Sequence, residues 1–274
     1  MAAGSGRGAV PLDAVILLIG DELLTGRLRD ANGQWIAHRL AALGHTTRRI
    51  VVVPDRVPEI VEELSRATTL AQWVFVSGGL GPTHDDLTTE AVARFLGVPT
   101  VVDAEGREDL ARKYRERYQK GLRPDAELTE ASLKQVTIPK GALPLPNPVG
   151  AAIGYVAKAP PGAQVVVMPG VPAEMQSIFA THVETLLPPG RPHALVLEVD
   201  VALPESLFSR QLDAIAREYA ELSIGSYPHF GEKRVTLRFR GEDADRVRAA
   251  AGKAVDAFRA HVIAERDVTN FTPG

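Results

Sequence analysis

Apolar residues follow two alternating patterns over the first 190 or so positions of the chain. The continuous apolar run at residues 14–19 and the segment at 72–76, which is apolar after Gln72, are typical of strands buried on both faces of a sheet. Between them, residues 31–43 carry apolar side chains at helical spacing and end at Gly44, which predicts a helix. This alternation predicts a three-layer α/β/α fold, in which helices cover both faces of a mostly parallel sheet.

The alternation continues along the rest of this region. A segment rich in proline and glycine at residues 139–154 breaks the pattern. Further strands are expected at residues 46–53 and 164–168, and further helices around residues 60–64 and at residues 88–96, 105–120 and 172–187.

The rhythm changes after residues 188–190, where two prolines and a glycine indicate a linker. Beyond the linker the order strand, helix, strand, strand, helix predicts a small two-layer α+β domain. We therefore expect a flexible N-terminus at residues 1–12, a large α/β domain at 13–188 and the small domain at 191–274. The elements of the small domain are expected at residues 194–203, 205–219, 222–227, 234–240 and 243–258.

Composition narrows the classes of function. The chain has no cysteine, which excludes disulfides, thiolate chemistry and zinc sites built on sulfur. A net charge of -3 argues against nucleic acid as a partner, because binding to a phosphate backbone needs a basic face. The short apolar runs cannot span a membrane, so we expect a cytoplasmic protein without a membrane partner.

The small domain offers little chemistry of its own. Its order of elements suggests RNA binding, but it has no Gly-x-x-Gly clamp between helices, and Glu232 and Glu242 dilute its basic residues. Residues 226–231 have aromatic character and are interpreted as a packed hairpin corner. We therefore expect no nucleic acid to bind here.

A glycine-rich loop between a predicted strand and a predicted helix is the strongest candidate site. Gly78, Gly79, Leu80 and Gly81 follow the strand at residues 72–76. Glycines allow positive φ angles, so that successive amides can converge on an anion, and a hydroxyl donor follows two residues later at Thr83. The spacing matches neither the P-loop nor the dinucleotide fingerprint, and a tight turn packed on the sheet is the alternative.

Two adjacent acids, Asp85 and Asp86, favour the binding site over the turn. A carboxylate about 4 Å from a phosphate is repelled by roughly 4 kcal/mol at an effective dielectric near 20, and a divalent cation between them reverses the sign. The two acids are therefore candidate ligands of Mg²⁺ or Mn²⁺. Asp86 could instead cap the next helix, and His84 is interpreted as a solvated loop residue.

Two more clusters follow predicted strands and are expected at the same edge of the sheet. Gly20, Asp21 and Glu22 follow the first strand, where the acids could bind a cation or ribose hydroxyls. The alternative for both acids is the stabilisation of a helix start, and Asp30 and Asn32 have the same interpretation as caps. After the last strand of the large domain, Pro169 and Gly170 allow close approach of the backbone, and Glu174 orients water or an ion unless it only caps a helix.

Four sequence motifs follow one another along the chain: Gly-Asp-Glu-Leu-Leu-Thr-Gly at 20–26, Gly-Gly-Leu-Gly-Pro-Thr at 78–83 with Asp-Asp-Leu-Thr at 85–88, Pro-Asn-Pro-Val-Gly at 146–150 and Pro-Gly-Val-Pro-Ala-Glu at 169–174. In this order they resemble the molybdopterin-binding (MoaB/MogA-like) domain family over roughly residues 13–187. The similarity is strongest to its CinA-like version and to the domain beside eukaryotic FAD synthase, and the tail from about residue 190 resembles the small domain that follows in CinA-like chains.

The resemblance implies a homo-oligomer, a dimer or trimer, that binds a pterin or an adenine nucleotide through the loop at residues 78–86. It also implies substrate contacts at Asn147 and Gly150. CinA-like chains usually continue into an amidase domain, so we expect that activity to be absent. Residues 150–154 read Gly-Ala-Ala-Ile-Gly where the family more usually has Gly-Thr-Ala-Pro-Gly, which leaves the position of the ligand there open.

These observations lead to one leading hypothesis and two alternatives. The leading hypothesis is metal-dependent hydrolysis of a diphosphate linkage in a substrate of the ADP-ribose or FAD type, with Asp85, Asp86 and Glu174 as catalytic residues. The first alternative is molybdopterin binding or adenylylation in molybdenum cofactor synthesis. The second is a non-catalytic ligand-binding or regulatory protein.

Overall fold

The computed structural model describes residues 11–190, 194–229 and 231–269. Most of the predicted flexible N-terminus lies outside these residues. The chain forms two compact units that divide next to Gly190, and each is described by itself. Among the described residues, no helix is both long enough and apolar enough to cross a membrane.

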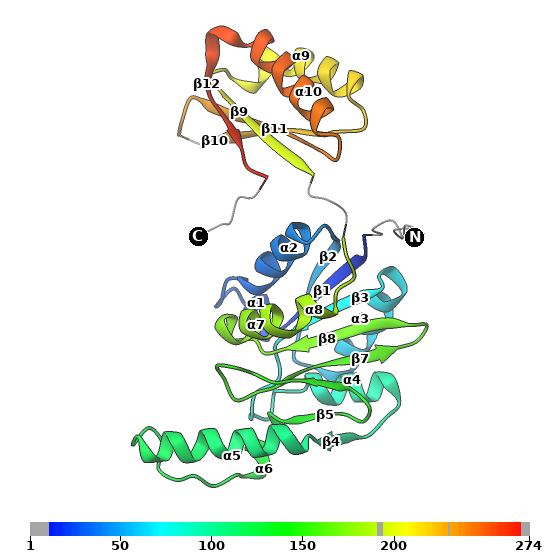
Figure 1. The fold of residues 1–274 in the computed structure, drawn as a ribbon, viewed down its shortest axis with the longest axis vertical. Coiled ribbons are helices and arrows are strands. Elements are labelled where there is room, and N and C mark those ends of the chain that lie inside the picture. Colours follow the sequence, from blue (N-terminus) through cyan, green and yellow to red (C-terminus); the bar gives the residue numbers. More distant parts are fainter. Residues whose placement is uncertain (1–10, 191–193, 230, 270–274) are drawn as a thin grey trace, which may run out of the picture. The chain divides into compact units, whose positions relative to one another are not determined.

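A six-stranded sheet forms the centre of the large unit (Figure 1). Its first four strands pair in parallel, and the last two are antiparallel. Every residue of the first strand except Asp13 is buried, as its apolar run predicts. The mostly parallel sheet is therefore confirmed. In spatial order the strands are β2 (Thr46–Val53), β1 (Asp13–Ile19), β3 (Trp73–Ser77), β8 (Ala163–Met168), β7 (Gly154–Ala159) and β6 (Leu143–Leu145).

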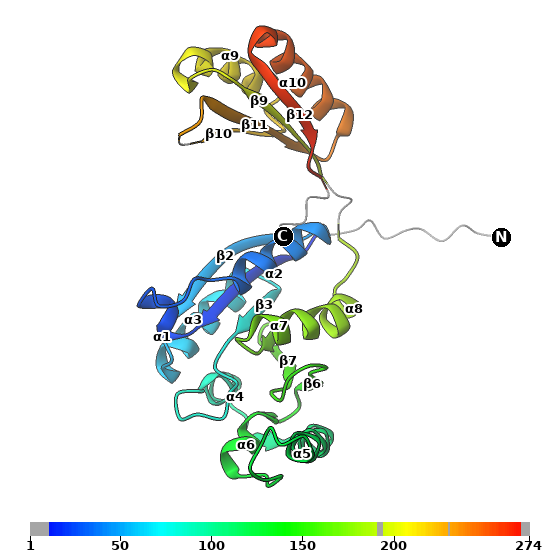
Figure 2. The ribbon, with the colours of Figure 1, turned by 90° about the vertical axis from the view of Figure 1, so that its left-hand side faces the viewer.

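Helices cover both faces of this sheet, which confirms the three-layer architecture (Figure 2). Side chains of α3 and α4 pack on the face that carries Val15 and Leu17. On the opposite face, Phe75 contacts Phe179, which in turn meets the edge of Trp35. These helices are α2 (Asn32–Ala42), α3 (Val57–Leu70), α4 (Thr88–Leu96) and the continuous run of α7 (Pro172–Ile178), η1 (Phe179–Val183) and α8 (Glu184–Leu186).

Several short elements were not predicted from the sequence. A separate two-stranded sheet and β6 consist of three-residue strands, which are too short to show an alternating pattern. The segment at residues 139–154 thus contains a strand rather than only irregular chain. The remaining elements of the large unit are α1 (Asp21–Leu24), β4 (Thr100–Val102), α5 (Ala104–Gln119), α6 (Glu130–Lys134) and β5 (Thr137–Pro139).

The small unit is a four-stranded antiparallel sheet with two helices on one face, as Figures 1 and 2 show. The predicted two-layer α+β fold is confirmed, with a fourth strand that the sequence pattern did not reveal. Its elements are β9 (Leu195–Val201), α9 (Glu205–Glu218), β10 (Ser223–His229), β11 (Arg234–Gly241), α10 (Ala244–Ala257), η2 (Arg259–His261) and β12 (Val262–Asp267), with the strands in the order β10-β11-β9-β12.

Candidate functional site

The four parallel strands of the large unit end at one edge of the sheet, and the predicted loops begin there. The amide of Gly20, after β1, donates to the carbonyl of Val53 at the end of β2 (3.1 Å). The amide of Gly78, after β3, donates to the carbonyl of Met168 at the end of β8 (3.1 Å). Main-chain bonds therefore join the loop after β3 to the end of β8, and the loop after β1 to the end of β2.

A buried side-chain cluster fixes the loops after β3 and β8 to each other. Asn32 Nδ2 donates to Ser77 Oγ (2.9 Å) and to the carbonyl of Gly170 (2.8 Å). Ser77 Oγ in turn donates to the carbonyl of Pro169 (3.0 Å). Asp30, not Asn32, accepts the amide of Gly33 at the start of α2. The interpretation of Asn32 as a cap is therefore wrong, and it joins two loops of the candidate site.

The loop after β3 requires glycine at its first two positions. Gly78 and Gly79 have φ angles of 113° and 68°. A β-carbon on Gly78 would lie 2.2 Å from the carbonyl oxygen of Ile19, and one on Gly79 would lie 2.2 Å from Thr88 Oγ1. Thr88 is buried and donates to the carbonyl of Gly78 (2.8 Å), so the first turn of α4 holds the loop in place.

Three successive amides of this loop are open to a ligand. Gly79, Leu80 and Gly81 donate no hydrogen bond to any described residue, whereas the amides of Gly78 and Thr83 are already bonded within the protein. The predicted set of anion-binding amides is therefore corrected to these three. The side chain of Leu80, the middle residue of the three, is buried in the core and anchors the loop. Consecutive amides in a glycine-rich turn suit a phosphate group.

Asp85 and Asp86 both turn towards Thr83. Asp86 Oδ2 accepts the amide of Thr83 (2.8 Å), and the Thr83 hydroxyl contacts a carboxylate oxygen of each acid. A β-carbon on Gly81 would lie 2.5 Å from Asp86 Oδ2, so the carboxylate of Asp86 packs directly against Gly81. Leu87 is the N-cap of α4, without a side-chain bond. The alternative of a helix cap at Asp86 is therefore wrong.

Asp85 belongs to a group of acids at the strand ends. Burial, and then repulsion from Glu22, Asp21 and Asp85, raise the pKa of Asp55, although a hydrogen bond from the amide of Asp21 (2.8 Å) opposes this. The Glu22 carboxylate lies over Gly20, where a β-carbon would come within 2.5 Å of it. We call Asp21, Glu22, Asp55 and Asp85 the acidic cluster. Asp55 was not predicted, although its position directly after β2 marks it.

Lys134 is a further group at this loop that the sequence did not reveal. Its ammonium group, on α6, donates to the carbonyl of Thr83. The hydrogen bond from the Thr83 hydroxyl lowers the pKa of Asp85, and the charges of His84 and Lys134 add to this effect. Asp85 is therefore ionised at neutral pH, and the ammonium group of Lys134 is near enough to favour that charge.

The acidic cluster fits a hard divalent cation by its chemistry but does not form a complete cage. Within the described parts of the chain, no three histidine, aspartate or glutamate side chains are arranged to hold a metal ion. Mg²⁺ commonly binds through one or two carboxylates, with substrate phosphates and water completing its shell. Asp85 and its neighbours fit that mode. Asp86 already accepts the amide of Thr83, and its role as a ligand stays a prediction.

The loop at residues 146–150 is held by buried polar contacts. Asn147 Nδ2 donates to the carbonyl of Ala152 (2.8 Å) and to Glu174 Oε2 (2.6 Å), and its Oδ1 accepts the amide of Gly150 (2.8 Å). Lys113 Nζ donates to the carbonyls of Asn147 and Gly150, both at 2.7 Å. Asn147 therefore shapes the loop, while its direct bond to a substrate and the catalytic role of Glu174 stay predictions.

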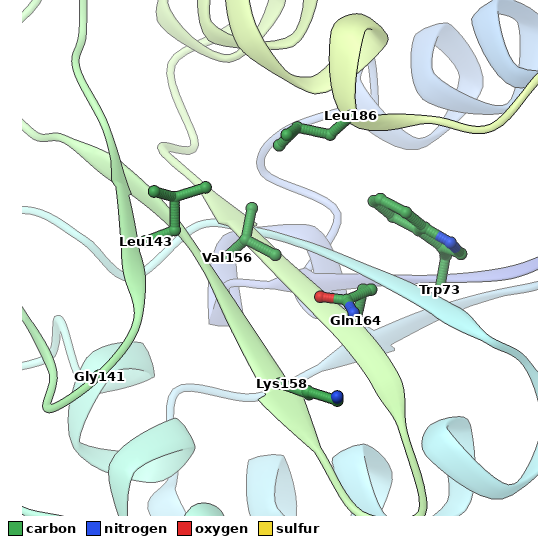
Figure 3. Close-up of a pocket in the computed structure, with 7 residues that line it drawn as sticks. All are labelled: Trp73, Gly141, Leu143, Val156, Lys158, Gln164 and Leu186. Atoms are coloured by element: carbon green, nitrogen blue, oxygen red, sulfur yellow. The ribbon is translucent and has the colours of Figure 1, made fainter.

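A shallow hollow of about 370 Å³ lies elsewhere on the large unit. Figure 3 shows Trp73 and Gln164 on adjacent strands below Leu186. Because Trp73 begins β3 and Gln164 lies near the start of β8, the hollow lies at the sheet edge opposite the glycine loop. None of the predicted site residues lines it, so it plays no part in the candidate site.

Comparisons with known proteins agree with the motifs at these loops. A family model described as "Probable molybdopterin binding domain" matches residues 15–189, and one described as "FAD synthase, middle domain" matches residues 193–267. A protein of Aeropyrum pernix is 38% identical over 254 residues, which cover 90% of this chain and 92% of that protein. The chain therefore belongs to the molybdopterin-binding domain family.

Within this family, the predicted resemblance to CinA-like proteins is confirmed. The CinA-like protein of Salinibacter ruber is 41% identical over 176 residues, 64% of this chain and 41% of that protein. The crystal structure of CinA from Thermoplasma acidophilum is 33% identical with a TM-score of 0.56, and the match covers 65% of this chain and 99% of that one. The large unit is thus a CinA-like molybdopterin-binding domain.

Proposed function

We propose that the large unit binds a nucleotide-like diphosphate on the loop at residues 78–86 and hydrolyses its phosphate–phosphate linkage with a divalent cation. The observation that carries the proposal is the row of open amides at Gly79, Leu80 and Gly81 next to the acidic cluster. The amides attract a phosphate, whereas each acid about 4 Å away repels it by roughly 4 kcal/mol. The two features work together when a cation lies between them.

Different residues of the loop and the acidic cluster have different roles in this proposal. The three amides hold phosphate oxygens, and Asp86 and Thr88 keep those amides in position through their bonds to Thr83 and Gly78. One or two carboxylates of the acidic cluster would hold Mg²⁺ or Mn²⁺. When bound, the cation neutralises charge on the phosphates and lowers the pKa of a water. Hydrolysis of the P–O–P linkage of a substrate held on these amides would give two phosphate monoesters.

A hydrolysis screen of the full chain tests the proposal. ADP-ribose, FAD and other dinucleotides are incubated with Mg²⁺, with Mn²⁺ or with EDTA, and products are identified by mass spectrometry. ADP-ribose should give AMP and ribose 5-phosphate, and FAD should give AMP and FMN, in the presence of metal alone. Asp85→Asn should abolish turnover, and Asp213→Asn, an exposed acid on α9, serves as the control.

Each other outcome counts against the proposal in its own way. Turnover that persists in EDTA and in the Asp85→Asn variant would remove the cation from the mechanism. Tight binding of a dinucleotide without any turnover would favour a ligand-binding or regulatory protein. Transfer of an adenylyl group to molybdopterin, without hydrolysis of a dinucleotide, would favour the role in cofactor synthesis.

A further inference from the structure

The small unit presents one face of its sheet without a covering helix. Both α9 and α10 pack on the other face, around Phe208, Leu237 and Phe239 (Figures 1 and 2). Strand register shows which side chains share the uncovered face, because alternate residues of a strand point to the same side. We call this surface the open face. One row across it is Gly225, Arg238, Glu198 and Arg266, and the next is Tyr227, Thr236, Asp200 and Ala264.

Two carboxylates lie beneath a layer of guanidinium groups on the open face. Glu198 and Asp200 are only 8% and 1% exposed, although no element of the described small unit covers them. Asp200 accepts bonds from Arg234 and Arg266, each at 2.9 Å. Glu198 accepts a bond from Arg238 at 2.7 Å. The outer layer of this face is therefore cationic, and the buried carboxylates hold its arginine side chains in position.

Some donors of this layer are not used by the carboxylates. Arg238 bonds through Nε and Nη2 and leaves Nη1 open, and Arg266 leaves Nε open. Arg240 follows Arg238 on the same face and is exposed, with no ion pair to any described residue. The side chains of Arg238 and Arg266 are 45% and 42% exposed. These groups can reach a ligand from solvent.

A flat aromatic surface adjoins these donors. The ring of Tyr227 lies back over Gly225, where a β-carbon would come within 3.3 Å of the ring. The guanidinium carbon of Arg238 lies 4.7 Å from the ring centroid, and Tyr227 remains 48% exposed. Tyr227, which was expected in a packed hairpin corner, is thus part of β10, and its ring lies over Gly225 on the open face. Aromatic and guanidinium planes are the groups on which proteins stack planar rings.

We propose that the open face binds a nucleoside phosphate, with its ring on Tyr227 and its phosphate on Arg238 and Arg240. Guanidinium groups bind phosphate through pairs of parallel N–H donors, which a lysine cannot offer. Because Glu198 already holds Arg238 in one conformation, binding orders fewer rotamers than on a free arginine surface. This site is separate from the glycine loop and does not rest on the function proposed for the large unit.

The test is a titration of the full chain with ADP in EDTA, followed by NMR of the backbone amides of β10 and β11. EDTA prevents turnover that depends on a divalent cation, and the amides report on the open face alone. Arg240→Gln should weaken binding roughly tenfold, as expected for a charged hydrogen bond. This variant removes no hydrogen bond, ion pair or ring contact to a described residue, so we expect it to fold. Arg248→Gln, an exposed arginine on α10, is the control of equal charge and should bind as the unaltered chain does.

A second variant separates the ring from the phosphate. Tyr227→Ala should weaken ADP binding while leaving the binding of inorganic pyrophosphate unchanged. The proposal is overturned if Arg240→Gln and Tyr227→Ala bind ADP as tightly as the unaltered chain, or if the amides of β10 and β11 do not respond to ADP. It is also overturned if a single-stranded oligonucleotide binds through Arg240 and Tyr227 while ADP does not. Melting curves confirm that each variant is folded.

Discussion

The amide of Asp21 donates to the carboxylate of Asp55 at 2.8 Å, while the side chain of Asp21 repels that same carboxylate. A main-chain amide thus stabilises the negative charge of Asp55, while the neighbouring acidic side chains destabilise it. Such an arrangement is unfavourable for the folded protein alone and favourable once a cation is bound. It is the clearest electrostatic sign that the strand ends form a site.

This relationship predicts how stability depends on pH. Because the pKa of Asp55 is raised above 3.8 in the folded protein, ionisation of this group destabilises the fold as pH rises from about 4 through the folded pKa. Asp55→Asn removes that cost and keeps an acceptor for the amide of Asp21. The variant should melt at or above the temperature of the unaltered chain at pH 7 without metal, and the difference should close below about pH 4. A lower melting temperature at pH 7 would contradict it.

Gly79 should be far less tolerant of substitution than another glycine of the same conformation. Gly79 and Gly97 share a φ angle of 68°, but a β-carbon meets Thr88 Oγ1 at 2.2 Å in the first case and nothing within 4 Å in the second. Both alanine variants carry backbone strain of about 1–3 kcal/mol. Gly79→Ala should lose clearly more than Gly97→Ala in urea unfolding. Equal losses would show that the contact with Thr88 is unimportant.

Asn32 should both stabilise the folded protein and hold the loops after β3 and β8 in position. Asn32→Ala removes the donors to Ser77 and Gly170 and leaves a carbonyl without a partner, so we expect a loss of about 2–4 kcal/mol in the free energy of unfolding. Ser77→Ala should cost less, about 1–2 kcal/mol, because Asn32 keeps its bond to Gly170. The double variant should lose less than the sum of the two. Strict additivity would contradict the shared network.

Asp85 and Asp86 should differ in what they do for the folded protein. Asp86 accepts the amide of Thr83, so Asp86→Ala should destabilise the loop by about 1 kcal/mol and speed hydrogen exchange at residues 79–88. Asp85 is fully exposed, and Asp85→Asn should leave exchange unchanged while abolishing the proposed turnover. Faster exchange in the Asp85 variant alone would reverse this assignment.

Asp200 should govern the stability of the small unit in acid. Burial alone would raise its pKa, but hydrogen bonds from Thr236, Arg266 and Arg234 outweigh it and lower the pKa of Asp200 to about 2. Its contribution is present above about pH 4 and is lost as pH falls towards 2. Asp200→Asn should therefore be less stable than the unaltered chain at pH 7 and similar to it at pH 2. Hydrogen exchange of the amides of β9 and β12 measures both.

Most of the longer elements of both units could be predicted from the sequence because each leaves a periodic pattern, whereas β7 was not expected. The apolar run of β1 and the helical spacing of α2 are examples. The three-residue strands β4 and β6 carry no such signal. Strand β12 escaped prediction because Glu265, Arg266 and Asp267 interrupt its alternation, and Arg266 is there to bond carboxylates on β9.

The candidate site was predicted by its glycines and acids but not by the residues that connect them. Asn32 and Asp55 are each isolated in sequence, and only the folded arrangement of the strands brings them to the same edge of the sheet. Lys134 lies 51 residues from the loop it contacts. Chain position could place Asp55 at a strand end, whereas no local pattern marks Asn32 or Lys134. Which amides are open also depends on the fold, since Met168 takes the amide of Gly78.

The Thr83 hydroxyl has a single hydrogen, which it can donate either to Asp85 or to Asp86. When a cation binds Asp85, the hydrogen can turn to Asp86, so that the hydroxyl still donates one hydrogen bond within the turn. Recruitment of Asp85 therefore requires no rebuilding of the surrounding chain. The carboxylate of Asp85 is therefore the one of the pair that can be given up to a ligand while Asp86 keeps its bonds to Thr83.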